Sequence, residues 1–148
     1  AEVIGLMMAR ILHLTRRANH TARLQGKAMQ LINFIRDIQE DLELGRQYLP
    51  QEDLEKFGIS KLSEDIDQIQ FTNLVRFEIQ RYHTLQKKAE EGYRYLPLRA
   101  RFPIAAAAAL YKWTASEISK DPMTVFQKKI KPSRSRIILE VSKQYLGL

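Results

Sequence analysis

Apolar residues recur at the three- and four-residue spacing of an α-helix along almost the whole chain. No segment alternates between apolar and polar residues convincingly enough to predict a strand. Glycine or proline interrupts the periodicity at Gly45, Gly58, Pro97 and Pro122, and each interruption predicts a helix end, whereas Pro103 suits the first turn of a new helix. The chain is therefore predicted to be all-α, with about six helices at 1–17, 21–44, 51–57, 62–95, 101–119 and 133–146.

Length and composition limit the class of protein. A chain of 148 residues suits one domain with a core of useful size, and no apolar stretch approaches the roughly 20 residues that a transmembrane helix needs. The sequence has no cysteine, which excludes disulfides and thiolate metal sites and fits a cytoplasmic protein. A net charge of +7 favours an anionic partner, which leaves nucleic acid, an anionic membrane surface and a phosphorylated small molecule open.

The second predicted helix carries a polar row through its most apolar segment, QLINFIRDIQED. At about 100° per residue, five positions fall within a stripe about 80° wide. Most of the remaining circumference is apolar, so this helix is predicted to be largely buried and its polar row to face an internal cavity. The stripe consists of Gly26, Gln30, Asn33, Asp37 and Asp41.

The two carboxylates of this stripe repel each other, and a bound cation would offset that repulsion. The carboxylates of Asp37 and Asp41, about 6 Å apart on one helix face, repel each other by about 3 kcal/mol at an effective dielectric constant near 20. Mg²⁺ takes one or two carboxylates, neutral oxygens, waters and substrate phosphates, and Asn33 offers a neutral oxygen one turn earlier. Arg36 and Arg46 could hold phosphate oxygens. The alternative is an acidic surface turn, but buried amides need partners, and the amides within the apolar run favour a metal site.

The string QLINFIRDIQED…GRQYLP resembles the second aspartate-rich motif of the squalene and phytoene synthase family, approximately QxxNxxRDxxED followed by a GRxYLP-like loop. Every defined position of that pattern is present. The preceding VIGLMM is similar to the segment before this motif in phytoene synthases, and the basic VFQKKIKPSRSRI resembles their C-terminal segment more loosely. The similarity extends over nearly the whole chain.

The resemblance implies the all-α isoprenoid synthase fold and the head-to-head joining of two prenyl diphosphates through a cyclopropylcarbinyl diphosphate intermediate. Two aspartate-rich motifs on facing helices would hold Mg²⁺ ions that bind the diphosphate. Carried over by position, the metal ligands are Asn33, Asp37 and Asp41, and the substrate-binding residues are Gln30, Arg36 and Arg46.

Further residues have both a functional and an ordinary reading. Tyr48 and Tyr111 could stabilise an allylic carbocation through their ring faces, while ordinary aromatic packing is slightly favoured for Tyr111. The alanines at 105–109 allow close helix packing, the favoured reading, or leave a smooth channel for a prenyl tail. Lys129 and Lys131 could assist diphosphate binding, although a solvated basic surface is the safer interpretation. The three histidines show no metal-ligand spacing and read as surface or packing residues.

The sequence departs from the family in one respect, because the first aspartate-rich motif should lie upstream of Ala1. SEDID at 63–67 has acidic spacing but sits in a polar connector after the second motif. We therefore expect 1–148 to be the C-terminal part of a single isoprenoid synthase domain, lacking N-terminal helices and inactive without the missing N-terminal half.

The leading interpretation is a phytoene synthase acting on two geranylgeranyl diphosphates with Mg²⁺. The alternatives are a squalene or dehydrosqualene synthase using farnesyl diphosphate, with NADPH needed only by the former, and a non-catalytic helical module of the same fold. No recognised motif supports nucleic-acid binding. The family resemblance also implies peripheral contact with a membrane.

Overall fold

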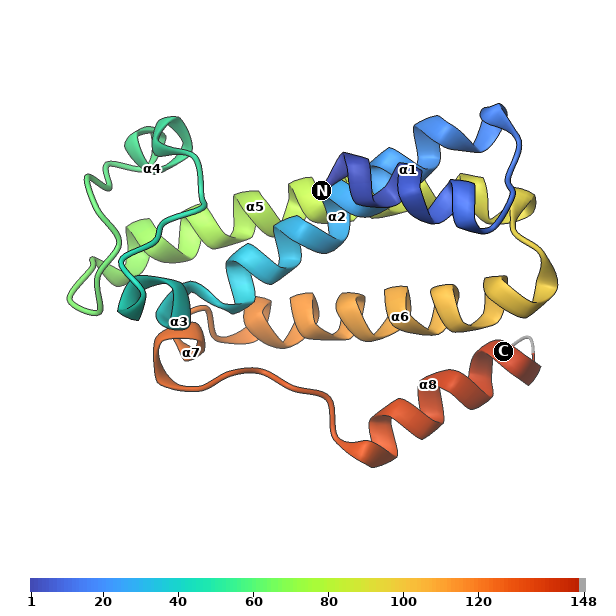
Figure 1. Ribbon diagram of the computed structural model, residues 1–148. Coiled ribbons are helices and arrows are strands. Elements are labelled where there is room, and N and C mark those ends of the chain that lie inside the picture. The colour runs from blue at the N-terminus through green and yellow to red at the C-terminus, as the bar shows by residue number, and fades with distance from the viewer. Residues whose placement is uncertain (147–148) are drawn as a thin grey trace.

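The computed structural model describes residues 1–146, and all of its regular secondary structure in that range is helical (Figure 1). The elements are α1 (Glu2–Ile11), η1 (Arg16–Ala18), α2 (Asn19–Arg36), α3 (Ile38–Glu43), α4 (Gln51–Lys56), α5 (Gln68–Glu90), η2 (Glu91–Tyr95), α6 (Leu98–Lys120), α7 (Thr124–Gln127) and α8 (Arg134–Leu146), where η marks a 3₁₀ helix. The all-α prediction is confirmed. Over the described residues, none of these helices combines the length and apolar character needed to cross a bilayer.

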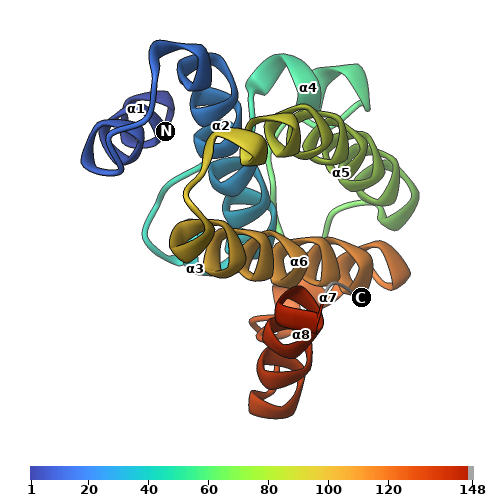
Figure 2. The same cartoon turned by 90° about the vertical axis from the view of Figure 1, so that its right-hand side faces the viewer.

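Three long helices, α2, α5 and α6, lie lengthwise beside one another and enclose the core (Figures 1 and 2). Their inner faces bury aliphatic and aromatic side chains almost completely, which supplies the main driving force for folding. The short helices α3 and α7 lie together at one end of the bundle, whereas η2 turns the chain from α5 into α6 at the other (Figure 1). The fully buried side chains of the core include Ile32, Ile35, Phe71, Leu74, Val75 and Ile118.

Helix α1 crosses the first half of α2 at very close range. A Cβ atom added to Gly5 would lie 2.0 Å from the carbonyl oxygen of Ala22, and one added to Gly26 would lie 2.3 Å from the carbonyl oxygen of Ala1. Because backbone atoms cannot retreat as a flexible side chain can, glycine is required at both crossings. The outer side of α1 is exposed, including Val3 at 65%.

Several predicted boundaries were wrong, each for a local reason. The first helix stops at Ile11 instead of continuing to 17, because His13 adopts a left-handed φ of 53°. The fourth predicted helix starts at 68 and not at 62, because the Asp67 carboxylate accepts a hydrogen bond from the Gln70 N–H at 2.8 Å and caps α5. Pro103 lies inside α6 and not in its first turn, because that helix already begins at Leu98.

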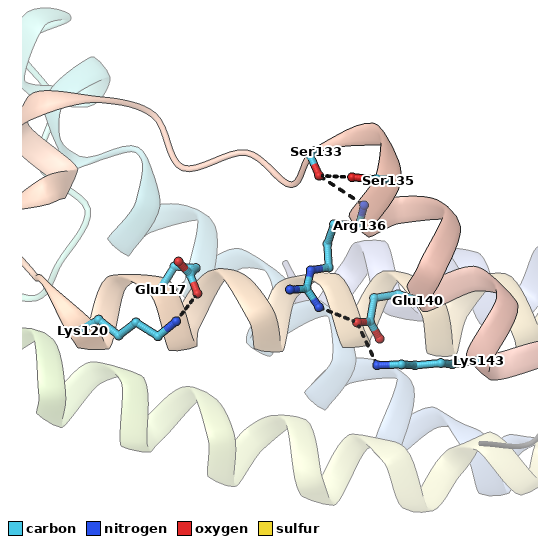
Figure 3. A network of polar contacts seen from close by, with 7 residues as sticks. All are labelled: Glu117, Lys120, Ser133, Ser135, Arg136, Glu140 and Lys143. Atoms are coloured by element: carbon cyan, nitrogen blue, oxygen red, sulfur yellow. Dashed lines mark hydrogen bonds and ion pairs between the residues drawn. The ribbon is translucent and has the colours of Figure 1, made fainter.

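Helix α8 contacts the outer side of α6 and, in Figure 2, extends away from that helix. In Figure 3 its polar contacts join residues of α8 and the turn before it, such as Arg136 with Glu140 at 3.3 Å and the Arg136 N–H with the Ser133 hydroxyl at 3.2 Å. Contact with α6 includes the stacked rings of Phe102 and Tyr145, whose centroids are 4.9 Å apart.

Candidate functional site

The polar row keeps its helical register across a break in the helix. Helix α2 ends at Arg36 and α3 begins at Ile38, with Asp37 between them at φ −100° and ψ 16°. The Asp37 N–H nevertheless donates to the Asn33 carbonyl at 2.9 Å, and the Asp41 N–H donates to the Asp37 carbonyl at 2.9 Å. Because both bonds span four residues, the three side chains stay on one face, as the sequence pattern predicts.

Asn33, in the polar row, has a side chain whose hydrogen-bonding capacity is not satisfied. Its side-chain Oδ1 is buried and has no hydrogen-bond partner. A buried acceptor without a partner costs about 1–3 kcal/mol, so such an atom in a native structure calls for an explanation. An amide oxygen is a suitable ligand for a hard cation, and this one lies one helical turn before a carboxylate.

Asp37 lies between two cations. Arg36 donates to its carboxylate through Nε at 2.8 Å and Nη2 at 2.6 Å, and the Lys129 Nζ lies 3.2 Å from its Oδ1. Burial opposes ionisation of this carboxyl, but the hydrogen bonds and charges of Arg36 and Lys129 outweigh it and lower the pKa of Asp37. Lys129 also pairs with Glu40. Lys129 therefore contacts the candidate site through its ion pairs with Asp37 and Glu40.

Asp41 occupies a different electrostatic environment. Burial and then the neighbouring charge of Asp37 raise the pKa of Asp41, and the charge of Arg46 partly offsets them. Arg46 is held over the end of α3 because its N–H donates to the Asp41 carbonyl at 2.7 Å, while Gly45 takes a left-handed φ of 68°. This arrangement is a Schellman C-cap, which explains the glycine before the arginine.

Tyr48 and Gln30 lie at the edge of the same face. The Tyr48 ring stacks on Phe34 with centroids 4.6 Å apart, and Asp41, Arg46 and Tyr48 line one small hollow. Gln30 and Tyr48 line an adjoining groove of about 250 Å³, on the side of α2 that faces the loop and α5. The structure thus brings Gln30 beside Tyr48.

Tyr111, from the middle of α6, approaches the site from the opposite wall. Hydrogen bonding to Asp37 is the main cause that raises the pKa of Arg36, and Tyr111, which packs against the core, is a smaller contributor to the same shift. Apart from Asn33, the residues that the sequence assigned to this site form, together with Lys129, two groups. One contains Arg36, Asp37, Tyr111 and Lys129, and the other contains Gln30, Asp41, Arg46 and Tyr48.

The donors that this face offers a metal are two carboxylates and one amide oxygen. Within residues 1–146, no group of three or more His, Cys, Asp or Glu side chains is arranged to hold a metal ion. The oxygen-only set fits Mg²⁺, which keeps several waters and shares its coordination with substrate phosphates. SEDID at 63–67 lies in the connector as predicted, where Asp67 caps α5 and Glu64 accepts a hydrogen bond from Gln39.

Sequence reasoning missed two polar clusters on α5. Arg81 Nη1 lies 2.8 Å from Asp53 Oδ2 and 3.2 Å from both oxygens of Glu78, whose side chain is fully buried. Gln86, also buried, joins the side chains of Gln25 and Tyr93 near the C-terminal end of α5. The sequence did contain a signal for them, because Glu78 and Gln86 occupy positions at helical spacing on the buried face of α5.

Comparison with known proteins gives consistent matches. A family model described as squalene/phytoene synthase matches residues 1–136. The chain is similar to a 15-cis-phytoene synthase of Synechocystis sp., at 40% identity over 106 residues that cover 70% of this chain and 32% of that protein. It is also similar to a chloroplastic phytoene synthase of an Oncidium hybrid cultivar, at 31% identity over 156 residues that cover 98% of this chain and 37% of that protein.

A solved structure matches almost the whole chain. It is a dehydrosqualene synthase in complex with ligand, with a TM-score of 0.83 and 27% sequence identity, and the match covers 99% of this chain and 54% of that one. The chain therefore spans about a third of the length of the two curated relatives and about half of the solved chain.

Proposed function

The chain belongs to the squalene/phytoene synthase family and has the all-α isoprenoid synthase fold, and from this premise we propose that the protein containing it joins two prenyl diphosphates head to head. The proposed substrates are two molecules of geranylgeranyl diphosphate and the proposed product is phytoene, formed through a cyclopropyl diphosphate intermediate. The phytoene synthases among its relatives support this choice of substrate.

Asn33, Asp37 and Asp41 are the proposed Mg²⁺ ligands. The orphaned Oδ1 of Asn33 is the observation that supports this assignment, because a buried oxygen needs a partner and a bound cation would supply one. A bound Mg²⁺ supplies positive charge to the departing diphosphate. The lowered pKa of Asp37 supports the role because it keeps the carboxyl ionised, and the metal would replace the contacts that Arg36 and Lys129 now make with its two oxygens.

Arg36, Arg46 and Lys129 are proposed to contact the diphosphate. Each belongs to one of the two groups of site residues, and their charges lie near the carboxylates that would share the metal. Guanidinium groups bind phosphate oxygens through paired N–H donors, which orients the leaving group as well as neutralising it. Gln30 is proposed to line the substrate side of the same region.

The carbocation left behind needs an apolar wall with electron-rich faces. Tyr111 is proposed to stabilise it from α6, and its approach to Arg36 supports that position. Tyr48 is proposed to act from the loop. Its stacking on Phe34 already engages one ring face, and 43% of its surface is exposed.

Substitution of the two aspartates tests this proposal. In the full-length protein, Asp37→Asn with Asp41→Asn is expected to lower Mg²⁺-dependent turnover of twenty-carbon prenyl diphosphate at least 100-fold, equivalent to about 2.7 kcal/mol or more of lost transition-state stabilisation. Asp65→Asn, in the exposed connector, is the matched control and should leave turnover unchanged. Unchanged turnover in the double variant would remove the metal assignment.

A squalene or dehydrosqualene synthase acting on farnesyl diphosphate is the second candidate, favoured by the similarity to the dehydrosqualene synthase structure. Incubating the full-length protein with labelled fifteen- and twenty-carbon substrates, with and without NADPH, separates these reactions. Absence of any condensation product would favour a non-catalytic module instead. A cytoplasmic location, which the absence of cysteine fits, and peripheral membrane contact, which the family implies, are both still predictions.

A further inference from the structure

We propose that Arg81 is a positioning residue, which holds α4 against α5 through Asp53 and thereby keeps Tyr48 in place at the candidate site. The inference rests on the proposed function, in which Tyr48 stabilises the carbocation. It gives a role to the cluster of Asp53, Glu78 and Arg81, called the Arg81 cluster below, which the proposed chemistry does not otherwise use.

The loop at 45–50, which carries Tyr48, is fixed at its first end by the cap of α3. There the Arg46 N–H donates to the Asp41 carbonyl at 2.7 Å. Residues 46–48 have no regular secondary structure and are exposed to solvent. The position of Tyr48 therefore also depends on how the other end of the loop is held, where the chain enters α4.

Helix α4 is short and has few means of attachment to the bundle. Leu54 is its buried residue, and its other positions are exposed or half-buried. One apolar side chain fixes how deeply a helix lies but leaves it free to turn about that contact. The exposed Lys56 ammonium, 3.9 Å from the centroid of the Phe77 ring on α5, adds a weak contact. The orientation of α4 is therefore left to Asp53.

Arg81 binds Asp53 through two parallel hydrogen bonds. Its Nη1 lies 2.8 Å from one carboxylate oxygen of Asp53, and its Nη2 lies 3.2 Å from the other. A bidentate pair of this kind fixes the relative orientation of its partners as well as their distance. The Asp53 side chain is only 13% exposed, so water competes little for its oxygens.

Glu78 holds the guanidinium of Arg81 from the inner side. Both of its carboxyl oxygens lie 3.2 Å from Arg81 Nη1, and its side chain is fully buried one turn earlier on α5. Burial raises the pKa of Glu78 to about 7. Burial also opposes ionisation of Asp53, but hydrogen bonding to Arg81 outweighs it and lowers the pKa of Asp53. Asp53 is thus the ionised partner that matches the charge of Arg81.

Arg81 also lines the groove of about 250 Å³ that adjoins the site, together with Gln30 and Tyr48. A direct contact with substrate in this groove is the other way in which Arg81 could influence the reaction. Substitution of Asp53 distinguishes the two roles, because it leaves the guanidinium in the groove and removes only the charged partner on α4.

Hydrogen exchange tests the attachment of α4 without any substrate. In the full-length protein, Arg81→Met and Asp53→Asn are each expected to speed exchange of the amides at 53–59 about tenfold or more, because losing hydrogen bonds to a charged group shifts a local opening equilibrium by such a factor. Amides in the middle of α6, at 106–118, should exchange at the wild-type rate, which separates local opening from global unfolding.

Two matched controls accompany these variants. Glu52→Gln removes the other acidic side chain from the first turn of α4, where it is exposed. Lys112→Met removes an ion pair with Glu90 that joins α6 to α5 away from the loop. Both controls should leave the exchange of α4 unchanged.

Kinetics test whether the Arg81 cluster acts through Tyr48. Arg81→Met and Asp53→Asn are each expected to lower kcat for prenyl diphosphate condensation about tenfold, since a small displacement of a group at the site can cost up to about 100-fold. Affinity for inorganic pyrophosphate with Mg²⁺ should stay unchanged, because Arg46 remains bound to the cap of α3. In a Tyr48→Ala background the same substitutions should have little further effect, because residues that act through one another are not additive.

The outcomes separate this inference from the proposed function. Thermal unfolding shows whether each variant is folded, and Asp53→Asn, which keeps the shape of the side chain, is the milder of the two. Folded variants with wild-type exchange in α4 and wild-type kcat would overturn the inference and leave the proposed function intact. Effects of Arg81→Met that Asp53→Asn does not reproduce, or that add to those of Tyr48→Ala, would also overturn it. A wild-type protein that converts no prenyl diphosphate would overturn the proposed function, and with it the action on catalysis, while the exchange rates would still decide the attachment of α4.

Discussion

Replacing Glu78 by glutamine is expected to remove a pH dependence of stability that the buried cluster on α5 creates. The Glu78 side chain is fully buried, and burial raises the pKa of this carboxyl from its ordinary 4.5 to about 7, against the opposing charge of Arg81. The folded protein therefore holds a proton that the unfolded chain releases between about pH 4.5 and 7. The stability that this group contributes is complete below pH 4.5 and is lost as the pH rises through 7.

The size of the effect follows from the interval between the two pKa values. An interval from 4.5 to about 7 corresponds to about 3 kcal/mol of unfolding free energy. Near its steepest point the slope approaches about 1.4 kcal/mol per pH unit, the limit for one proton. Glutamine keeps the shape of the side chain but does not titrate. The difference in unfolding free energy between Glu78→Gln and wild type should thus grow by about 3 kcal/mol in favour of the variant from pH 4 to pH 8.

Urea unfolding followed by circular dichroism between pH 4 and 8 measures this difference. Subtracting the two curves cancels the titration of other groups, including His83, whose pKa is lowered by burial and which titrates in the opposite sense. Parallel curves for variant and wild type would refute the reasoning, because they would mean that Glu78 ionises normally in the folded protein. Asp53, which follows the loop at 45–50, shares Arg81 with Glu78, so the same cluster ties that loop to α5.

Two further substitutions test contacts elsewhere. Lys129→Gln is expected to raise the pKa of Asp37 measured by NMR, because one of its two cations is lost, and to cost about 0.5 kcal/mol of stability; an unchanged pKa would contradict the pair. Gly5→Ala is expected to lower the melting temperature by several degrees, because the added Cβ would meet the Ala22 carbonyl at 2.0 Å; wild-type stability would show that α1 does not cross α2 this closely.

The helices were predictable because each depends on a local pattern of apolar residues. Their ends were predictable only where a residue with a strong capping preference, such as glycine, stands at the boundary. Gly45 ends α3 with the backbone bonds of a Schellman motif, as a glycine after an apolar period predicts. The start of α5 was missed by six residues, because several positions in the polar connector could cap a helix and the competition is decided by where Phe71 must be buried. Boundaries of this kind depend on tertiary packing.

The acidic face was predictable because its three donors lie on continuous helical register, which survives the break at Asp37. Lys129 was assigned to this face less firmly. It is 89 positions from its partner Glu40, and no spacing rule relates residues so far apart in the sequence. Which basic residue of the cluster at 128–131 reaches Asp37 is set by the path of the chain after α7. That path is a property of the packed bundle.

The buried polar residues of α5 show that a helical face can be visible in the sequence and still be assigned wrongly. Phe71, Val75, Glu78, Tyr82 and Gln86 follow one another at intervals of three or four and lie on one inner face. An analysis that looks only for apolar residues at helical spacing does not select Glu78 and Gln86. It selects Phe77 and Leu85 instead, which are only half-buried. Because a buried polar side chain requires a partner from another element, such positions mark where helices are tied together. Here the cluster of Glu78, in the middle of α5, joins that helix to Asp53 through Arg81, and Gln86, near the end of α5, joins it to α2 and η2.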